Sequence, residues 1–229
     1  MITLIYLVIL IIVIIISKLL LKTKYKPKFN ISIEGNIGSG KSTILEELRK
    51  LKYCVECQKF LKISSLLKKF YDDKENRKSE DMYILQKSIY DIYKETWNTK
   101  YETQYEVRLL EGICSSVNVF SKRSFDKKEI NEKDFINLNE KCNLKKDGII
   151  PNLIIYLNCP PKVCKERIDK DREIEKGIDL KYLEEIDNYY NLFLNTTNIK
   201  VIKINTENIP IGIVIKNILL LLKNFIGWF

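Results

Sequence analysis

Hydrophobic and polar residues divide this chain into an apolar beginning and a longer region in which two periodicities alternate. Residues 2–16 carry no charge. After residue 28, short stretches rich in apolar residues, of which Phe29–Glu34 alternates, are interleaved with longer stretches in which apolar residues recur every three or four positions. The first pattern predicts strands, over Phe29–Glu34, Tyr53–Cys57, Tyr105–Leu110, Leu153–Asn158 and Lys200–Asn205. The second predicts helices, over Ser42–Leu51, Leu61–Phe70, Asp81–Trp97, Ser115–Phe120, Asn131–Lys141, Pro161–Asp169, Leu180–Leu194 and Ile211–Phe225.

This alternation of strands and helices predicts an α/β fold. Its three layers are a central five-stranded parallel sheet and a layer of helices on each face. In such sheets, ligands bind beyond the carboxyl ends of the strands. The segments to examine are therefore the loop after the first strand, Glu56 after the second, Glu111 after the third, and Cys159-Pro160-Pro161 after the fourth.

The uncharged beginning predicts an N-terminal transmembrane helix. Apolar residues resume at Leu19 after Ser17 and Lys18, so residues 2–21 are long enough to span a bilayer core, which takes about 20 residues. A cleaved signal peptide is a weaker alternative, because no basic segment precedes the run and no small-residue cleavage site follows it. A buried core helix is the other alternative. We expect a membrane anchor over 1–22, a basic linker over 23–28 and a globular domain over 29–229.

Charge is concentrated beside this anchor. The net charge is +9, but five of the 39 basic residues and none of the 30 acidic ones lie in residues 1–28, so the remainder carries only +4. A basic segment after a membrane helix favours a domain that faces the cytosol, and it could also contact anionic headgroups. The mildly basic domain has no basic stripe interleaved with aromatic residues, which argues against nucleic-acid binding.

The six cysteines indicate buried thiols in a reducing compartment. Cys54 and Cys57 have the spacing of a redox or zinc motif. The chain contains no histidine and no second pair with this spacing, and the two residues lie within a predicted strand. Free buried cysteines are therefore the favoured interpretation.

The segment between the first strand and the first helix carries the strongest chemical signal. Residues 35–42 read Gly-Asn-Ile-Gly-Ser-Gly-Lys-Ser, which matches the phosphate-binding pattern G-x-x-x-x-G-K-[ST] at every fixed position. Its glycines allow backbone N–H groups to surround phosphate oxygens at a helix N-terminus. We expect ATP or GTP to bind this loop, with Lys41 on the β- and γ-phosphates and the Ser42 hydroxyl on Mg²⁺. The predicted nucleotide-binding residues are Gly35, Asn36, Ile37, Gly38, Ser39, Gly40, Lys41, Ser42 and Thr43.

Two carboxylates end the strands that follow. Glu56 and Glu111 come at the ends of the second and third predicted strands, where both would face the γ-phosphate. One carboxylate near Mg²⁺ and one near an acceptor hydroxyl would suit phosphoryl transfer to an alcohol. Solvated acids at the ends of strands are the alternative interpretation.

Residues 33–43, together with shorter matches downstream, resemble the deoxyribonucleoside kinase family over roughly residues 29–225. The resemblance implies a P-loop kinase fold, ATP and Mg²⁺ as cofactors, a deoxynucleoside substrate and a homodimer. It implies that Glu56 is the catalytic base, that Gln86 binds the nucleoside base and that Glu111 lies near Mg²⁺ and the substrate. In the segment resembling the family's lid, it implies that Arg172 contacts the transferring phosphate and Glu175 the sugar 3′-hydroxyl.

The chain departs from the family pattern mainly by loss of arginines. Gly112 replaces the arginine of the E-R-S motif, Tyr93 replaces an arginine that often helps to read the base, and the lid keeps one clear arginine. Arginines stabilise charge in phosphoryl transfer, so these losses indicate either a slow kinase or a retired ATP-binding module on a membrane. A nucleoside monophosphate kinase is a third reading. No arginine lies between Arg49 and Arg77 to bind an acceptor's phosphate, so a deoxynucleoside 5′-hydroxyl is the favoured acceptor.

Overall fold

The computed structural model describes residues 26–50, 54–56, 64–72, 78–99, 106–114, 116–143 and 145–227, together with Tyr6, Ile11 and Ile12. Five strands in this part of the chain form one sheet, in the order β2-β3-β1-β4-β5, and every pairing is parallel. The strands are β1 (Phe29–Gly35), β2 (Cys54–Glu56), β3 (Val107–Glu111), β4 (Leu153–Asn158) and β5 (Val201–Asn205).

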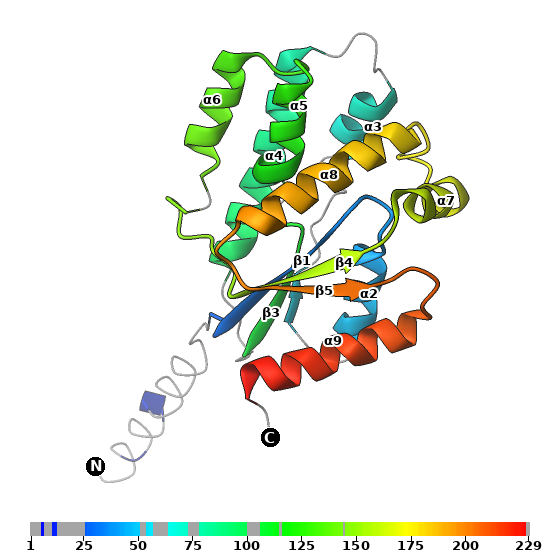
Figure 1. The fold of residues 1–229 in the computed structure, drawn as a ribbon. Coiled ribbons are helices and arrows are strands. Elements are labelled where there is room, and N and C mark those ends of the chain that lie inside the picture. The colour runs from blue at the N-terminus through cyan, green and yellow to red at the C-terminus, as the bar shows by residue number, and fades with distance from the viewer. Residues whose placement is uncertain are drawn as a thin grey trace.

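Helices cover both faces of the sheet. Figure 1 shows α2 and α9 on one face and α4, α5 and α8 on the other, which confirms the predicted α/β layering. The helical elements are α2 (Lys41–Arg49), α3 (Ser64–Asp72), α4 (Ser79–Asn98), the π-helical segment η2 (Ser116–Ser121), α5 (Lys122–Asp126), α6 (Glu132–Lys141), α7 (Pro161–Asp171), α8 (Leu180–Thr196) and α9 (Ile211–Ile226).

The central strand β1 shows why two hydrophobic cores form. Ile31 and Ile33 point to one face and join a cluster with residues of α2 and α9, including Leu45 and Ile218. Residues alternate between faces along a strand, so Ser32 and Glu34 point to the opposite face, where the larger cluster lies. Both polar side chains are fully buried. A buried serine and glutamate on the middle strand are unusual, and they lie beside the predicted nucleotide loop.

Most predicted elements agree with the structure to within a few residues, and one differs in kind. The helix predicted over Ser115–Phe120 is a π-helical segment that continues into α5. The Asn118 side chain donates a hydrogen bond of 2.8 Å to the Cys114 carbonyl. In an α-helix that carbonyl would accept from the backbone N–H of residue 118, so the side chain competes with regular helix geometry at this point.

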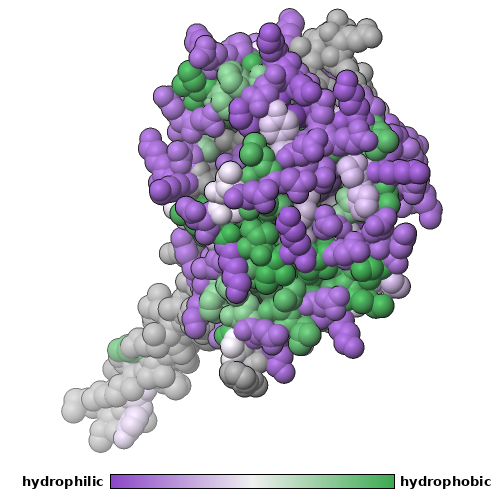
Figure 2. Space-filling model, in the orientation of Figure 1, coloured by the Kyte–Doolittle hydropathy of each residue, from purple (hydrophilic) through white to green (hydrophobic). Residues whose placement is uncertain are grey.

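The predicted membrane anchor falls almost entirely outside the described residues and stays a prediction. Within the described part, no helix has the length and apolar character that crossing a bilayer requires. Figure 2 shows hydrophilic residues over most of the visible face, with apolar residues gathered in its lower half. The side chains of four of the six cysteines are described, and all four are free and buried as predicted: Cys114, Cys142, Cys159 and Cys164.

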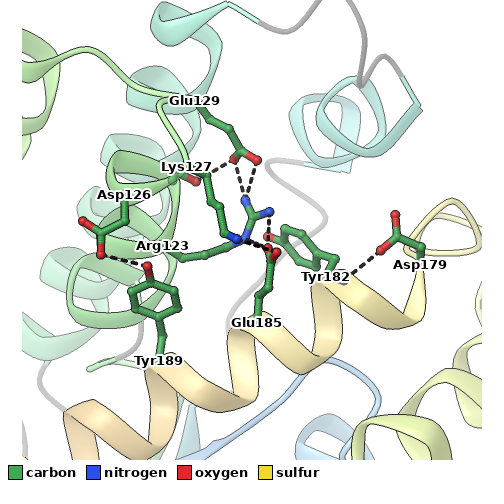
Figure 3. Close-up of polar contacts among 9 residues, drawn as sticks. Arg123, Asp126, Lys127, Glu129, Asp179, Tyr182, Glu185 and Tyr189 are labelled. Atoms are coloured by element: carbon green, nitrogen blue, oxygen red, sulfur yellow. Dashed lines mark hydrogen bonds and ion pairs between the residues drawn. The ribbon is translucent and has the colours of Figure 1, made fainter.

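A buried arginine fixes the first turns of α8, the helix that follows the predicted lid (Figure 3). Arg123 lies 2.6 Å from a Glu129 oxygen and 2.7 Å from a Glu185 oxygen. Its guanidinium also stacks over the Tyr182 ring, 4.4 Å from the ring centre. Burial opposes ionisation of Glu185, but hydrogen bonds from Lys127 and Arg123 outweigh it and hold the pKa of this carboxyl below its usual value. These contacts give Arg123 a structural role, in which it joins α5 to α8.

Candidate active site

The nucleotide loop follows β1 and leads directly into α2. Gly38 and Gly40 have φ values of +82° and +99°, which residues with a side chain rarely adopt. The Asn36 side chain accepts from the Ile37 N–H at 2.9 Å and donates to the Leu183 carbonyl of α8 at 2.8 Å. Asn36 therefore ties the loop to the helix that follows the lid.

Lys41 lies inside the curve of this loop. Its Nζ donates hydrogen bonds of 2.8 and 2.9 Å to the carbonyl oxygens of Gly35 and Asn36. Burial lowers the pKa of Lys41, with a contribution from the charge of Arg172, while the carboxylates of Glu111 and Glu34 oppose the shift. The charge of Arg172 in the lid therefore acts on the lysine of the loop.

Ser42 and Glu111 meet across the end of the sheet. The Ser42 hydroxyl donates a 2.8 Å hydrogen bond to a Glu111 carboxylate oxygen. The register of β1 and β3, which pairs Ile33 with Glu111, brings this carboxylate beside the loop. Among the described residues no group of three or more His, Cys, Asp or Glu could hold a metal alone. A hydroxyl and one carboxylate nevertheless fit Mg²⁺, which usually takes few protein ligands and fills its shell with water and phosphate oxygens.

Contacts with α7 and with the residue after β5 hold Ser39 of the glycine loop in place. Arg167 donates to the carbonyl oxygens of Ser39 at 3.3 Å and Thr206 at 2.8 Å. The buried Ser39 hydroxyl has no hydrogen-bond partner in the described part of the chain. Unsatisfied buried groups are rare in native proteins, and one in a phosphate-binding loop fits a site completed by a ligand. No role for Arg167, which lies on α7 before the lid segment, is predicted from the sequence.

Of the predicted catalytic base Glu56 and the predicted nucleoside-binding residue Gln86, only Gln86 has a described side chain. Glu56 ends β2, and its backbone pairs with Leu110, the residue before Glu111. Its side chain lies outside the described part. Gln86 is buried in the middle of α4, with 3% of its surface exposed. It lies two turns before Tyr93 on the same helix face, and Tyr93 reaches the turn after β3.

The lid segment between α7 and α8 brings its two predicted residues together. Arg172 and Glu175 form an ion pair with a separation of 3.2 Å. The lid also lies against α3, because a Cβ on Gly177 would approach the Tyr71 carbonyl oxygen to 3.2 Å. Exposed Lys170 is in the last turn of α7.

Two contacts beside the site are not predicted by the sequence. Glu34, fully buried on β1, accepts a hydrogen bond from the Cys114 backbone N–H at 2.8 Å. The Tyr93 hydroxyl donates to the Gly112 carbonyl. Gly112 has a φ of +60°, so an arginine could not simply be restored there without strain. The sequence signal that could have indicated a buried role for Glu34 is its position two residues after Ser32, on the same face of a predicted central strand.

Replacing Gly38 by alanine is expected to disrupt the loop. A Cβ at this position would lie 2.5 Å from the Cys164 carbonyl oxygen, and the φ of +82° is itself unfavourable for alanine. The strain costs about 1–3 kcal/mol, and the clash adds to it. Calorimetry should show ATP affinity reduced at least about tenfold, which corresponds to about 1.4 kcal/mol.

Gly148→Ala is the matched control for this change. Gly148 also has a positive φ, of +68°, but a Cβ there would meet nothing within 4 Å. It should lose stability through backbone strain and keep wild-type ATP affinity. Equal ATP affinity in the two variants would contradict a role for this close approach in shaping the loop.

Comparisons with known proteins show the family to which this chain belongs. A model of the deoxynucleoside kinase family matches residues 31–226. Deoxycytidine kinase 2 of Gallus gallus is 29% identical over 216 residues, which cover 79% of this chain and 79% of that protein. Deoxyadenosine kinase of Dictyostelium discoideum is 28% identical over 189 residues, which cover 77% of this chain and 71% of that protein. A solved structure of deoxyadenosine kinase from M. mycoides with bound dATP has a TM-score of 0.69 at 19% identity, covering 85% of this chain and 99% of that one, and this likeness concerns the fold.

The glycine loop, its lysine and the hydroxyl–carboxylate pair at the end of a parallel sheet define a P-loop nucleotide-binding protein. Within that class, the chain belongs to the deoxynucleoside kinase family, and it is an enzyme that phosphorylates nucleosides with ATP.

Proposed function

We propose that this protein transfers the γ-phosphate of ATP to the 5′-hydroxyl of a deoxyribonucleoside, with Mg²⁺ bound beside the phosphates. The observation that carries the proposal is the contact between Ser42 and Glu111, beside Lys41. An uncoupled serine or a glutamate turned to solvent would suit a loop that had lost its function. The paired arrangement is what a working phosphate site requires.

In this proposal the residues of the loop and the lid carry the phosphate charge. Lys41 binds the β- and γ-phosphate oxygens in place of the loop carbonyls that it contacts now. Arg172 approaches the transferring phosphate from the lid, and Glu175, its present partner, binds the sugar 3′-hydroxyl. Fixed positive groups of this kind stabilise the charge that spreads over the phosphoryl oxygens.

Glu56 acts as the general base in this proposal. Its strand end lies beside that of β3, so a carboxylate there can reach an acceptor next to the γ-phosphate. It takes the proton of the 5′-hydroxyl as that oxygen attacks phosphorus, and Gln86 binds the base edge through its amide. Mg²⁺, held by Ser42 and Glu111, neutralises charge on the phosphate oxygens when bound.

The test is whether a nucleoside stimulates ATP turnover. The full-length protein would be given ATP and Mg²⁺ with each of the four deoxynucleosides, and separately with each deoxynucleoside monophosphate, and ADP release would be measured. We expect at least one nucleoside to stimulate release and the monophosphates to have no effect. ATP binding without stimulation by any nucleoside would contradict the proposal, and stimulation by monophosphates alone would indicate a nucleoside monophosphate kinase.

A further inference from the structure

The turn that follows β3 sets the position of the Glu111 carboxylate. It runs from Glu111 to Cys114 and is almost inaccessible to solvent, with Glu111 3% and Cys114 1% exposed. Since Glu111 begins this turn and accepts the hydrogen bond from Ser42, any group that fixes the turn also fixes the carboxylate. Three elements other than β3 contribute such groups.

The first set of contacts acts on Gly112. Its N–H donates to the Ile33 carbonyl of β1 at 2.9 Å. Its carbonyl accepts from the Tyr93 hydroxyl of α4 at 2.5 Å. Tyr93 and Gly112 are two positions at which the chain departs from the family pattern by loss of an arginine. The structure places them in direct contact, so the two departures belong to one local arrangement.

The second contact acts on Cys114, at the other end of the turn. Glu34 accepts from its backbone N–H at 2.8 Å. The same carboxylate accepts from the Ser32 hydroxyl at 2.6 Å and from Tyr190 of α8 at 3.4 Å. A carboxylate with no solvent exposure is costly to bury unless hydrogen bonds satisfy it. Because Glu34 directly precedes Gly35, these contacts join the turn to the strand that carries the nucleotide loop.

We propose that Glu34 and Tyr93 are positioning residues that hold Glu111 where it and Ser42 bind the Mg²⁺ of a bound nucleotide. Tyr93 acts on the turn through the Gly112 carbonyl, and Glu34 acts through the Cys114 N–H. Groups that orient metal ligands typically change metal affinity 10- to 100-fold when they are removed. The inference rests on the nucleotide and metal binding of the proposed function and does not require phosphate transfer.

The test compares ADP affinity with and without metal. Calorimetry would measure ADP binding to the full-length protein in excess Mg²⁺ and in EDTA, and the ratio of the two affinities reports the coupling between nucleotide and metal. We expect Tyr93→Phe and Glu34→Ala each to reduce this ratio about tenfold. ADP affinity in EDTA should stay close to the wild-type value in Tyr93→Phe, because the Tyr93 hydroxyl donates to the Gly112 carbonyl and not to the glycine loop. In Glu34→Ala, loss of the carboxylate charge near Lys41 acts on ADP binding with and without metal alike, so the ratio cancels that effect.

Glu34→Gln separates hydrogen bonding from charge. A glutamine oxygen can still accept from the Cys114 N–H and from Ser32, so this variant should retain most of the coupling that Glu34→Ala loses. Coupling as weak in Glu34→Gln as in Glu34→Ala would overturn positioning by hydrogen bonds.

Tyr90→Phe and Glu185→Ala control for loss of stability. Tyr90 is a buried tyrosine one turn before Tyr93 whose hydroxyl donates to Asp147, and Glu185 belongs to the Arg123 cluster. Both variants should lower the unfolding temperature and leave the coupling ratio unchanged. The inference is overturned if the ratio of ADP affinities in Mg²⁺ and in EDTA is unchanged in Tyr93→Phe and Glu34→Ala. It is also overturned if the wild-type protein binds ADP equally well in Mg²⁺ and in EDTA. Either result leaves phosphate transfer to be judged by nucleoside-stimulated turnover.

Discussion

Replacing Lys41 by methionine is expected to lower kcat/KM for nucleoside phosphorylation about a thousandfold. Methionine keeps much of the length of the side chain and removes the charge that the loop directs at the phosphates. Loss of one preorganised charge-stabilising group costs about 100- to 1,000-fold in rate, and this chain has few arginines to compensate. Steady-state kinetics with varied ATP and saturating nucleoside would measure kcat/KM for ATP.

Lys50→Met is the control for this change. Lys50 lies at the other end of the same helix, is exposed, and pairs with Glu47. Its loss should leave kcat/KM within about twofold, because exposed ion pairs contribute little. A Lys41→Met enzyme that keeps a tenth or more of the wild-type rate would contradict the role given to this lysine.

Replacing Glu56 by glutamine is expected to reduce kcat about a thousandfold with little change in ATP affinity. Glutamine has the shape of glutamate but cannot accept the proton of the 5′-hydroxyl, and general-base catalysis contributes about 100- to 10,000-fold. Single-turnover measurement of phosphate transfer would isolate the chemical step, and calorimetry would report ATP binding.

The result for Glu56→Gln distinguishes a role in proton abstraction from a role in ATP binding. Glu46→Gln, an exposed change on α2, should leave the single-turnover rate at the wild-type value. If Glu56→Gln transferred phosphate at the wild-type rate, proton abstraction would have to be assigned to another group. If it lost ATP affinity as well, Glu56 would belong to the nucleotide site instead.

The framework of the fold could be predicted because its local signals agree with its tertiary structure. Leu153–Asn158 was predicted at its observed boundaries, since a continuous apolar run between Pro151 and Pro160 leaves little choice. The glycine loop was equally clear, because its backbone conformations require glycine at Gly38 and Gly40. Both Ser42 and Glu111 were expected near Mg²⁺, Ser42 from the glycine-loop pattern and Glu111 from the family resemblance, but the direct hydrogen bond between them was not predicted.

The supporting contacts could not be predicted, because they join residues that are distant along the chain. Nothing in the sequence pairs Tyr93 with Gly112, or Glu34 with Cys114. The roles of the arginines were hidden for the same reason. Arg108 lies on β3 as predicted, but its guanidinium donates to the carbonyl oxygens of Thr96 and Trp97 at the end of α4, which the sequence does not indicate. Such contacts depend on how the helices cross the sheet, which periodicity alone does not determine.

Transfer of labelled phosphate tests the central claim most directly. Full-length protein would be incubated with γ-labelled ATP, Mg²⁺ and each of the four deoxynucleosides, alongside Lys41→Met and Glu56→Gln, and the nucleotide products would be separated. We predict that label appears in the 5′-monophosphate of at least one nucleoside and is lost in both variants. Measurable ATP binding with no labelled monophosphate from any nucleoside would contradict the account and identify Gly112 as the mark of a site that has lost catalysis.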